Sequence, residues 1–568
     1  MPRFTANSTF TFQRLWPFIF ILLLAYPIGV YYRVIVQNAY NFPYEDDLNS
    51  TLSFIADYAF GGLDLWDKLK LIFSQYNEHR IVFDRIVFLT DYGLFGQLNF
   101  RHCILIGNLA PLLIGLLFYS VSFRGLSLAQ KLLYLVPVVY TLFSFQYWEL
   151  STWSMAALQN LYVIPFALLS LYNLCKPNRT AFALACGMAV LATFTSGNGL
   201  FTFVAGVGVL SLLKSYRKLT VWVLVSAVTI GLYFWGYIRP PYHPDIADSL
   251  FNHTGRAVTY FFTLLGSMIG PARPKLAVLF GVASFLVTLG LLGYLGYKKR
   301  LTAHLPLVGW LAFLYLTCLS LMASRSGMGI EQAYTPRYGI VVVMVFATQA
   351  VLALETLTYR SIRLGVLGMY SLISIYFYFS ATNQGNSHRI EDRTRQMRYN
   401  SALYHINPTQ ASLHWGNQAI ANPIFNDAIR KDIYQVPQLS FSDLEASPQS
   451  FNPTTLVDSH NVTSDVTPYV ASNFLVIYRT WAQLNGESPF HMTIQFVAKS
   501  ITDCYAFDTQ KHIWDDPGDH TLGRHYTRPG FSCVINKSGL RPGHYKLWVC
   551  LTDGATKAYQ PLDVQFDV

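Results

Sequence analysis

The chain has 568 residues, of which 52% are apolar, 16% aromatic and only 13% charged. Because a soluble protein carries about 25% charged residues, this composition excludes an ordinary soluble fold and predicts a membrane protein with many spanning segments. The net charge of +10 does not indicate a nucleic-acid partner, since the basic residues form short clusters between apolar runs rather than one stripe.

The first predicted element is a spanning helix near the N-terminus. Arg3 and Arg14 flank the start of an apolar stretch that includes Phe18–Tyr32, and no convincing cleavage site with small residues follows it. We therefore expect an uncleaved helix with a cytoplasmic N-terminus. A long loop follows over residues 37–102, in which apolar residues recur at helical spacing and predict helices along the membrane interface.

Further apolar runs bring the expected number of spanning helices to about eleven, which predicts an all-α polytopic membrane domain over residues 1–382. The runs lie at about 103–121, 132–148, 155–174, 180–197, 199–213, 220–238, 276–297, 305–323, 338–354 and 364–381. The run Ala257–Gly270 is short for a span and is interpreted as re-entrant or interfacial. With that assignment the basic clusters all fall on the cytoplasmic side, and the first loop shares the other side with everything after Thr382.

The composition changes after Thr382. Residues 383–449 begin with a polar and charged stretch and are expected to form an extracytoplasmic connecting segment. From about residue 450, short runs rich in β-branched and aromatic residues, such as Tyr545–Val549, alternate with turn signals. Residues 450–568 therefore predict an extracytoplasmic β-rich domain of the β-sandwich type.

The cysteines do not indicate a metal site. Four of the seven lie in or beside apolar segments, where a thiol behaves as a small hydrophobe, and none shows the spacing of metal ligands. The other three, Cys504, Cys533 and Cys550, lie in the β-rich part and allow at most one disulfide there.

Chemistry-bearing residues gather on the predicted outer side. The segment Tyr44-Glu45-Asp46-Asp47 follows the first helix, where carboxylates can face a watery cavity and take a proton from a substrate. A solvated acidic loop is the alternative interpretation. The other outer candidates are Glu78, His79, Arg80, Trp148, Glu149, Trp153, His243, His253, Arg325, Arg337 and Tyr338.

Arginines are the candidates for binding a phosphate, because a guanidinium donates bidentately and keeps its charge. Arg325 and Arg337 are expected at the phosphate of a lipid-linked donor, with Tyr338 and Arg80 beside them. Alternatively, the first two arginines anchor their helices at the headgroups, and Arg80 pairs only with Glu78. The candidates for binding the acceptor or a sugar are Glu78, His79, Trp148, Trp153, His243 and His253, although the tryptophans also fit an ordinary interfacial belt.

This layout resembles the GT-C class of glycosyltransferases that use lipid-phosphate-linked sugars. The resemblance covers the architecture of about residues 10–400. The short pieces that carry it are Tyr44-Glu45-Asp46-Asp47, Asn77-Glu78-His79-Arg80, Thr195-Ser196-Gly197-Asn198-Gly199-Leu200 and Pro336-Arg337-Tyr338. It implies that Asp46 or Asp47 is the catalytic base and that Arg325 and Arg337 grip the lipid phosphate.

The chain also departs from one branch of that class. The C-terminal part lacks the Trp-Trp-Asp signature of oligosaccharyltransferases, which argues against asparagine glycosylation and leaves a divalent metal without a signal in the sequence. Bacterial members that modify envelope glycans or pilin are closer in layout, and an arabinosyltransferase-like enzyme is one of them. We therefore expect no cofactor, and a divalent metal stays possible although no residue pattern indicates one.

Together these features predict an inverting glycosyltransferase that moves a sugar from a polyprenyl-phosphate donor to a hydroxyl of a glycan, lipid-linked glycan or protein. The expected location is the bacterial inner membrane, with the C-terminal domain in the periplasm and membrane lipid around the helices. One alternative is a polymerase or ligase of lipid-linked glycans that relies on pairs such as His79-Arg80. Another is a lipid-sugar flippase, which would predict internal repeats that the sequence does not show.

Overall fold

The computed structural model describes residues 9–241, 244–383, 385–406, 413, 418–439, 445–470, 473–485, 492–515, 527–553 and 556–568. The chain divides into two compact units. The first contains residues 1–39, 43–387 and 424–435, and the second contains residues 40–42, 388–423 and 436–568. The residues expected to form one connecting segment, 383–449, are thus shared between the two units.

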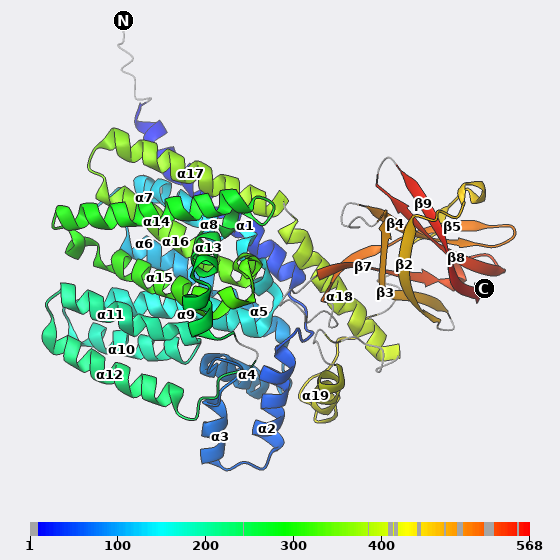
Figure 1. Ribbon diagram of the computed structural model, residues 1–568, viewed down its shortest axis with the longest axis horizontal. Helices are drawn as coiled ribbons and strands as arrows, with labels where there is room; N and C mark the ends of the chain where they lie inside the picture. Colours follow the sequence, from blue (N-terminus) through cyan, green and yellow to red (C-terminus); the bar gives the residue numbers. More distant parts are fainter. Residues whose placement is uncertain are drawn as a thin grey trace, which may run out of the picture. The chain divides into compact units, whose positions relative to one another are not determined.

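The first unit is helical (Figure 1). Its first helices are α1 (Thr9–Asn38), α2 (Phe54–Phe60), α3 (Leu65–Ile72), α4 (Val82–Phe95), α5 (Phe100–Gly107), α6 (Ala110–Val121), α7 (Leu128–Tyr134), α8 (Val136–Leu142) and α9 (Ser154–Leu174). They are followed by α10 (Arg179–Thr193), α11 (Phe201–Leu212), α12 (Tyr216–Phe234), α13 (Thr254–Leu265), α14 (Pro274–Tyr297), α15 (Leu305–Arg325), α16 (Gly339–Thr356) and α17 (Arg360–Asn383). Two later helices are α18 (Asn386–Ile406) and α19 (Gln418–Arg430).

Among the described residues, 8 helical segments are long and apolar enough to cross a membrane. They are Trp16–Asn38, Phe100–Val121, Ser154–Leu174, Tyr216–Phe234, Pro274–Tyr297, Leu301–Met328, Pro336–Thr356 and Arg360–Ala402. The prediction of a membrane protein is confirmed, whereas the expected number of about eleven spans is not.

The difference arises where apolar runs fold into shorter helices. The run expected at 132–148 breaks into α7, α8 and the 3-10 segment η2 (Phe145–Thr152). The runs expected at 180–197 and 199–213 form α10 and α11, which have 15 and 12 residues, whereas a straight span needs about 20. Helix α13, in the run interpreted as re-entrant or interfacial, also has only 12 residues.

Helices α9 and α16 form the centre of the first unit. In their most apolar stretches, 83% of the residues in the α9 segment and 94% of those in the α16 segment are buried. Helix α9 packs against α5, α6, α10, α11 and α15, and α16 packs against α8, α14, α15 and α17. In the α12 and α14 segments only 17% of the residues are buried, the pattern of helices that face lipid.

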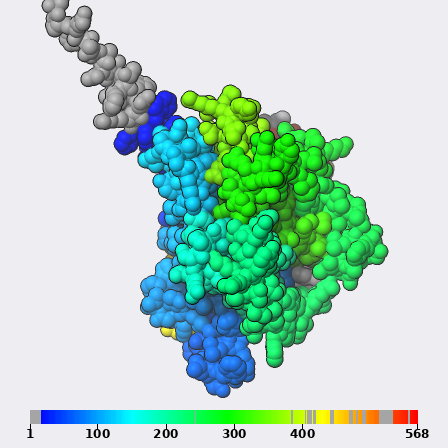
Figure 2. Space-filling view, turned by 90° about the vertical axis from the view of Figure 1, so that its left-hand side faces the viewer, coloured from blue at the N-terminus to red at the C-terminus, as the bar shows by residue number. Residues whose placement is uncertain are grey.

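The first loop forms short helices, in agreement with its helical spacing. Helix α3 begins after Asp64, whose side chain accepts a hydrogen bond from the Asp67 N–H at 2.8 Å. Its apolar residues Leu65, Trp66 and Leu69 are exposed, which is typical of a helix at a membrane interface. Figure 2 shows the residues of α2 and α3 (blue) at one end of the displayed face.

The second unit is β-rich, as the C-terminal sequence predicts. Its strands are β1 (Gln449–Ser450), β2 (Val462–Val470), β3 (Phe474–Leu484), β4 (Thr493–Lys499), β5 (Cys504–Asp508), β6 (Gln510–Asp515), β7 (Thr527–Asn536), β8 (His544–Thr552) and β9 (Lys557–Asp567). They form two antiparallel sheets with strand orders β1-β5-β4-β8-β9 and β2-β3-β7-β6.

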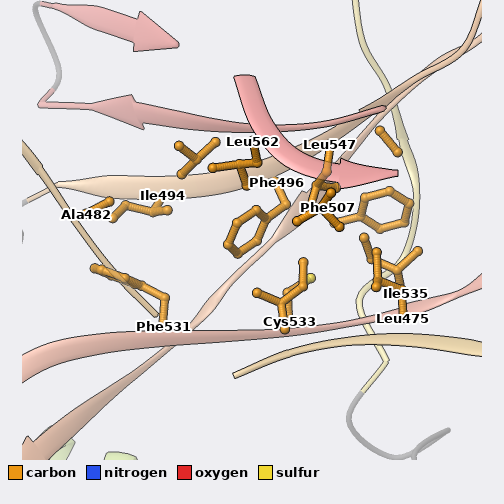
Figure 3. Close-up of a cluster of buried hydrophobic side chains, with 14 of the residues drawn as sticks. Leu475, Ala482, Ile494, Phe496, Phe507, Phe531, Cys533, Ile535, Leu547 and Leu562 are labelled. Atoms are coloured by element: carbon orange, nitrogen blue, oxygen red, sulfur yellow. The ribbon is translucent and has the colours of Figure 1, made fainter. Parts of the chain in front are cut away.

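Apolar side chains from both sheets form one core (Figure 3). Leu475 and Ile477 of β3 share it with Phe496 of β4, because alternate residues of a strand point to the same face. Val476, which points the other way, packs with Tyr399 of α18, so this helix covers the opposite face of the four-stranded sheet. All seven cysteines are free thiols, and no disulfide forms in this unit.

Candidate functional site

Asp47 serves the fold of the first unit. It is buried, with 1% of its surface exposed. Its Oδ1 accepts hydrogen bonds from Ser154 Oγ at 2.6 Å and from the Met155 N–H at 2.9 Å, in the first turn of α9. Burial raises the pKa of Asp47 to about 7, against the effect of these hydrogen bonds and of one from the Tyr44 N–H. Asp47 therefore caps the N-terminus of the central helix.

Asp46 lies in a different environment, although it is the preceding residue. Its side chain is only partly buried, and its Oδ1 accepts a hydrogen bond from the Tyr76 hydroxyl at 2.7 Å. Burial raises the pKa of Asp46, while the Tyr76 hydrogen bond and the charge of Arg337 oppose that rise. A partly exposed carboxylate that feels the charge of a cation can accept a proton from a hydroxyl, so the environment favours Asp46 over the enclosed Asp47 as a base.

A tight hairpin at Tyr76–His79 brings three side chains into the site. Tyr76 and His79 exchange backbone hydrogen bonds of 2.8 and 2.9 Å, and Asn77 adopts a positive φ of 47° at the tip. Glu78 forms an ion pair with Arg325. The hairpin therefore contacts Asp46 through Tyr76 and a late arginine through Glu78.

His79 is positioned by the turn between α10 and α11. Its Nδ1 accepts a hydrogen bond from the Gly197 N–H at 3.0 Å, which places the ring proton of the neutral imidazole on Nε2. The Nε2 atom lies 3.6 Å from Glu78 Oε1. A Cβ atom at Gly197 would come within 2.9 Å of the Tyr233 hydroxyl, so a side chain here would disturb this arrangement.

Arg80 binds backbone rather than facing an open space. Its guanidinium donates to the carbonyl oxygens of Phe73, Tyr233 and Trp235, and the Tyr233 contact is 2.6 Å long. These bonds tie the first loop to the end of α12. Three of its five N–H donors are thus taken up by backbone oxygens, which leaves two for any donor phosphate.

Arg337 is held by Glu149, and its charge acts on Asp46. The Arg337 N–H donates to Glu149 Oε2 at 3.2 Å, and its NH1 atom lies 3.8 Å from Glu149 Oε1. The guanidinium carbon is 6.0 Å from the Trp153 ring and 5.7 Å from the Tyr338 ring. Trp153 is itself 4% exposed and packs on Tyr44, so its ring forms a wall of the cluster.

Tyr260 of α13 adds a residue that the sequence did not single out. The charges of Arg325 and Arg337 both act on its hydroxyl, which therefore lies near the two arginines. The hydroxyl is buried and has no hydrogen-bond partner among the described residues. Tyr260 can therefore donate a hydrogen bond to a ligand held by the arginines.

The remaining sequence candidates are Trp148, His253 and His243. Trp148 is buried in η2, next to Glu149. The His253 imidazole is half exposed and lies 3.8 Å from Asp248. His243 lies outside the described residues. Within the described part of the chain, no group of three or more His, Cys, Asp or Glu residues could hold a metal ion.

The structure thus gathers Asp46, Glu78, Arg325 and Arg337 from distant parts of the sequence. Tyr76 was missed because an aromatic residue in an interfacial loop carries no signal of its own. The site combines one candidate base with two guanidinium groups, which suits a reaction between a hydroxyl and an anionic donor. Comparison of the chain with models of known families, curated proteins and solved structures finds no match.

Proposed function

We propose that the protein is an inverting glycosyltransferase that moves a sugar from a polyprenyl-phosphate donor to a hydroxyl acceptor. The observation that carries the proposal is that the charge of Arg337 acts on Asp46, although the two residues are about 290 positions apart, in a chain with helices long and apolar enough to span a membrane. A base next to a phosphate-binding group is the minimum that such a transfer needs.

In this proposal Asp46 removes the proton of the acceptor hydroxyl as its oxygen attacks the anomeric carbon of the sugar. The bond from that carbon to the lipid phosphate breaks, and the phosphate leaves with the electron pair. The Tyr76 hydroxyl fixes the orientation of the Asp46 carboxylate. Asp47 has a structural role: its hydrogen bonds attach the segment that carries Asp46 to the start of α9.

Arg325 and Arg337 stabilise the charge of the leaving phosphate. Glu78 and Glu149 hold them in place. A guanidinium has five N–H donors, more than one carboxylate takes up, so each arginine can bind a phosphate while its position is maintained. Tyr260 supplies a further hydrogen bond from the side of α13.

The membrane arrangement is part of the proposal. The shorter helices α10 and α11 complete a set of about eleven crossings together with the segment of α7 and α8, in the inner membrane of a bacterium. The two sheets form a β-sandwich on the same side as the candidate site, in the periplasm, where the glycan or protein acceptor is met. The backbone contacts of Arg80 favour transfer over the ligase alternative, which would rely on His79-Arg80.

The test is single-turnover transfer from radiolabelled polyprenyl-phosphate sugars by the purified full-length protein in liposomes. The substitution Asp46→Asn keeps the size of the side chain but removes the base, so transfer is expected to slow by about 10²–10⁴-fold. Asp47→Asn is the matched control, since it changes the neighbouring carboxylate that caps α9.

Both variants must show the same helical circular dichroism and the same donor binding as the unchanged protein. Near-normal transfer by folded Asp46→Asn would remove this residue as the base. Failure of the unchanged protein to transfer any sugar from a panel of donors, despite donor binding, would reject the proposed reaction.

A further inference from the structure

A second cluster of charged side chains lies at the far end of α9 from the candidate site. Helix α9 has 21 residues and begins at Ser154, which contacts Asp47. At about 1.5 Å per residue the helix is about 30 Å long, close to the thickness of the hydrocarbon core. Tyr172, in its last turn, therefore lies at the opposite membrane interface.

Two cations share the Tyr172 side chain. Arg124 NH2 donates a hydrogen bond to the Tyr172 hydroxyl at 2.8 Å, and the guanidinium carbon lies 5.8 Å from the ring centroid. Lys176 Nζ lies 4.1 Å from the centroid of the same ring and donates to Asn173 Oδ1 at 3.0 Å. The tyrosine thus fixes two positive charges close to each other.

Lys131 is the third member of the cluster. Its Nζ lies 4.0 Å from the ring centroid of Tyr119 in α6. Burial and the charge of Arg124 lower the pKa of Lys131, so the charge of Arg124 acts on this side chain. Lys218 fixes the backbone beside Lys176, because its Nζ donates to the Lys176 carbonyl oxygen at 2.9 Å.

The three cations of the cluster, Arg124, Lys131 and Lys176, have no acidic partner in the described part of the chain. No ion pair there involves Arg124, Lys131 or Lys176. The acidic residue near this loop is Glu355, whose Oε1 accepts the Phe123 N–H at 2.6 Å and whose Oε2 lies 3.2 Å from His304 Nδ1. The carboxylate is thus engaged by other groups.

Three cations held together without a counter-charge repel one another unless an anion lies between them. The neighbouring surface is apolar, since Leu116 and Leu128 are 59% and 49% exposed. An anion with an apolar chain can contact the cations with its charge and the exposed leucines with its chain. We propose that Arg124, Lys131 and Lys176, arranged around Tyr172 and Tyr119, bind the phosphate of an anionic phospholipid.

The experiment measures lipid binding to the delipidated full-length protein by native mass spectrometry, with phosphatidylglycerol and phosphatidylcholine as the two probes. The double variant Arg124→Gln/Lys176→Gln removes two charges from the cluster. Arg217→Gln/Arg300→Gln is the matched control, because it removes two exposed charges elsewhere, at the start of α12 and after α14. Tyr172→Phe is a milder variant that keeps all charges but removes the hydroxyl that holds Arg124.

The unchanged protein is expected to bind phosphatidylglycerol more tightly than phosphatidylcholine. The double variant should lose about tenfold or more in affinity for phosphatidylglycerol alone, since each basic residue near a membrane surface contributes about 1 kcal/mol. The matched control should keep its preference, and Tyr172→Phe should show a smaller loss. An equal loss of phosphatidylglycerol affinity in the double variant and in the control would overturn the site. If the double variant does not fold, an unchanged phosphatidylglycerol affinity of Tyr172→Phe would overturn it.

A third arm separates a lipid from a soluble anion. Inorganic phosphate at millimolar concentration is added to the phosphatidylglycerol complex, and the bound lipid is expected to remain. Displacement of the lipid by phosphate alone would overturn the assignment of a phospholipid. Because the cluster and the Asp46 site lie at opposite ends of α9, sugar transfer is not needed for any of these measurements.

Discussion

At the residue scale, burial separates two adjacent carboxylates of the same chemistry. Asp46 is partly exposed and bonded to Tyr76, whereas Asp47 is enclosed by the start of α9. Neighbouring side chains diverge because the backbone turns between them, and Glu45 just before them has a positive φ of 48°. Each carboxylate therefore has its own dependence on pH.

The substitution Tyr76→Phe is expected to shift the acid limb of the pH–rate profile to higher pH by about 1 unit. The Tyr76 hydroxyl lowers the pKa of Asp46, and one lost hydrogen bond of about 1 kcal/mol corresponds to a shift of this size. The base works when ionised, so the variant loses activity at a higher pH during acidification. Single-turnover rates between pH 4 and pH 9 check this.

Tyr92→Phe is the matched control, because Tyr92 lies in the same loop and its hydroxyl makes no hydrogen bond in the described part of the chain. Its profile should coincide with that of the unchanged protein. If Tyr76→Phe has the same acid limb as the unchanged protein, Tyr76 does not act on the base. The charges of Arg337 and Glu78 and the Asn77 side chain also act on Asp46, and both variants retain these groups.

Asp47 should make the stability of the protein fall as the pH rises from about 4 to about 7. Its pKa rises from the ordinary 3.8 to about 7 on folding, so the folded state binds the proton more tightly than the unfolded state. This contribution to stability is complete below the lower pKa and is lost as the pH passes the higher one. The asparagine variant at this position should show a flatter dependence of Tm on pH, measured in one detergent throughout.

At the scale of elements, the turn between α10 and α11 carries the His79 contact and has little room for side chains. A Cβ atom at Gly199 would lie 2.1 Å from the Ala192 carbonyl oxygen, which is backbone and cannot rotate away. At Gly197 the nearest atom would be the Tyr233 hydroxyl at 2.9 Å. A side chain at Gly199 therefore requires the backbone to move, whereas one at Gly197 requires the Tyr233 side chain to move.

Gly199→Ala is expected to cost about 2 kcal/mol or more of stability, and Gly197→Ala less, because only the former forces the backbone apart. Gly187→Ala in α10 is the control, since no atom lies within 4 Å of its added Cβ and alanine favours a helix. Thermal unfolding of the three variants in one detergent gives the order. A Tm of Gly199→Ala equal to that of the control would contradict the close approach.

At the scale of the whole molecule, a short segment far along the chain belongs to the helical unit. Residues 424–435 are part of the first unit although the chain has already passed through residues of the second. The Leu98 N–H donates to the Ile433 carbonyl oxygen at 2.8 Å, and Tyr434 packs on Phe100 with ring centroids 5.5 Å apart. This segment stabilises the loop before α5.

Two truncated proteins test this contribution. A chain that ends at Leu439 lacks the β-strands but keeps the segment, whereas a chain that ends at Ile406 lacks both. The shorter protein is expected to unfold at a Tm lower by about 5 °C or more, since it loses a backbone hydrogen bond and a buried aromatic contact. Equal Tm values for the two would show that residues 424–435 do not stabilise the helical unit.

The sequence by itself determined the class of the molecule, since composition and apolar runs reflect the solvent that each segment meets. It predicted a membrane protein, helices in the first loop and a β-rich C-terminal region, which all appear in the structure, while the location of the first-loop helices at the membrane interface stays a prediction. It also named Asp46, Glu78, Arg325 and Arg337 as candidates. The structure confirms 8 long candidate spans rather than the expected eleven or so, because apolar composition does not tell where helices such as α7 and α8 break.

Only the tertiary structure decided which of these residues meet. Whether Asp46 or Asp47 is open depends on Ser154 and Met155, more than 100 positions away, which enclose Asp47. The same holds for Arg80, whose guanidinium is taken up by backbone carbonyls from two segments, and for Tyr76 and Tyr260, which carry no motif. Such contacts arise from long-range packing of helices, and a local sequence pattern does not contain them.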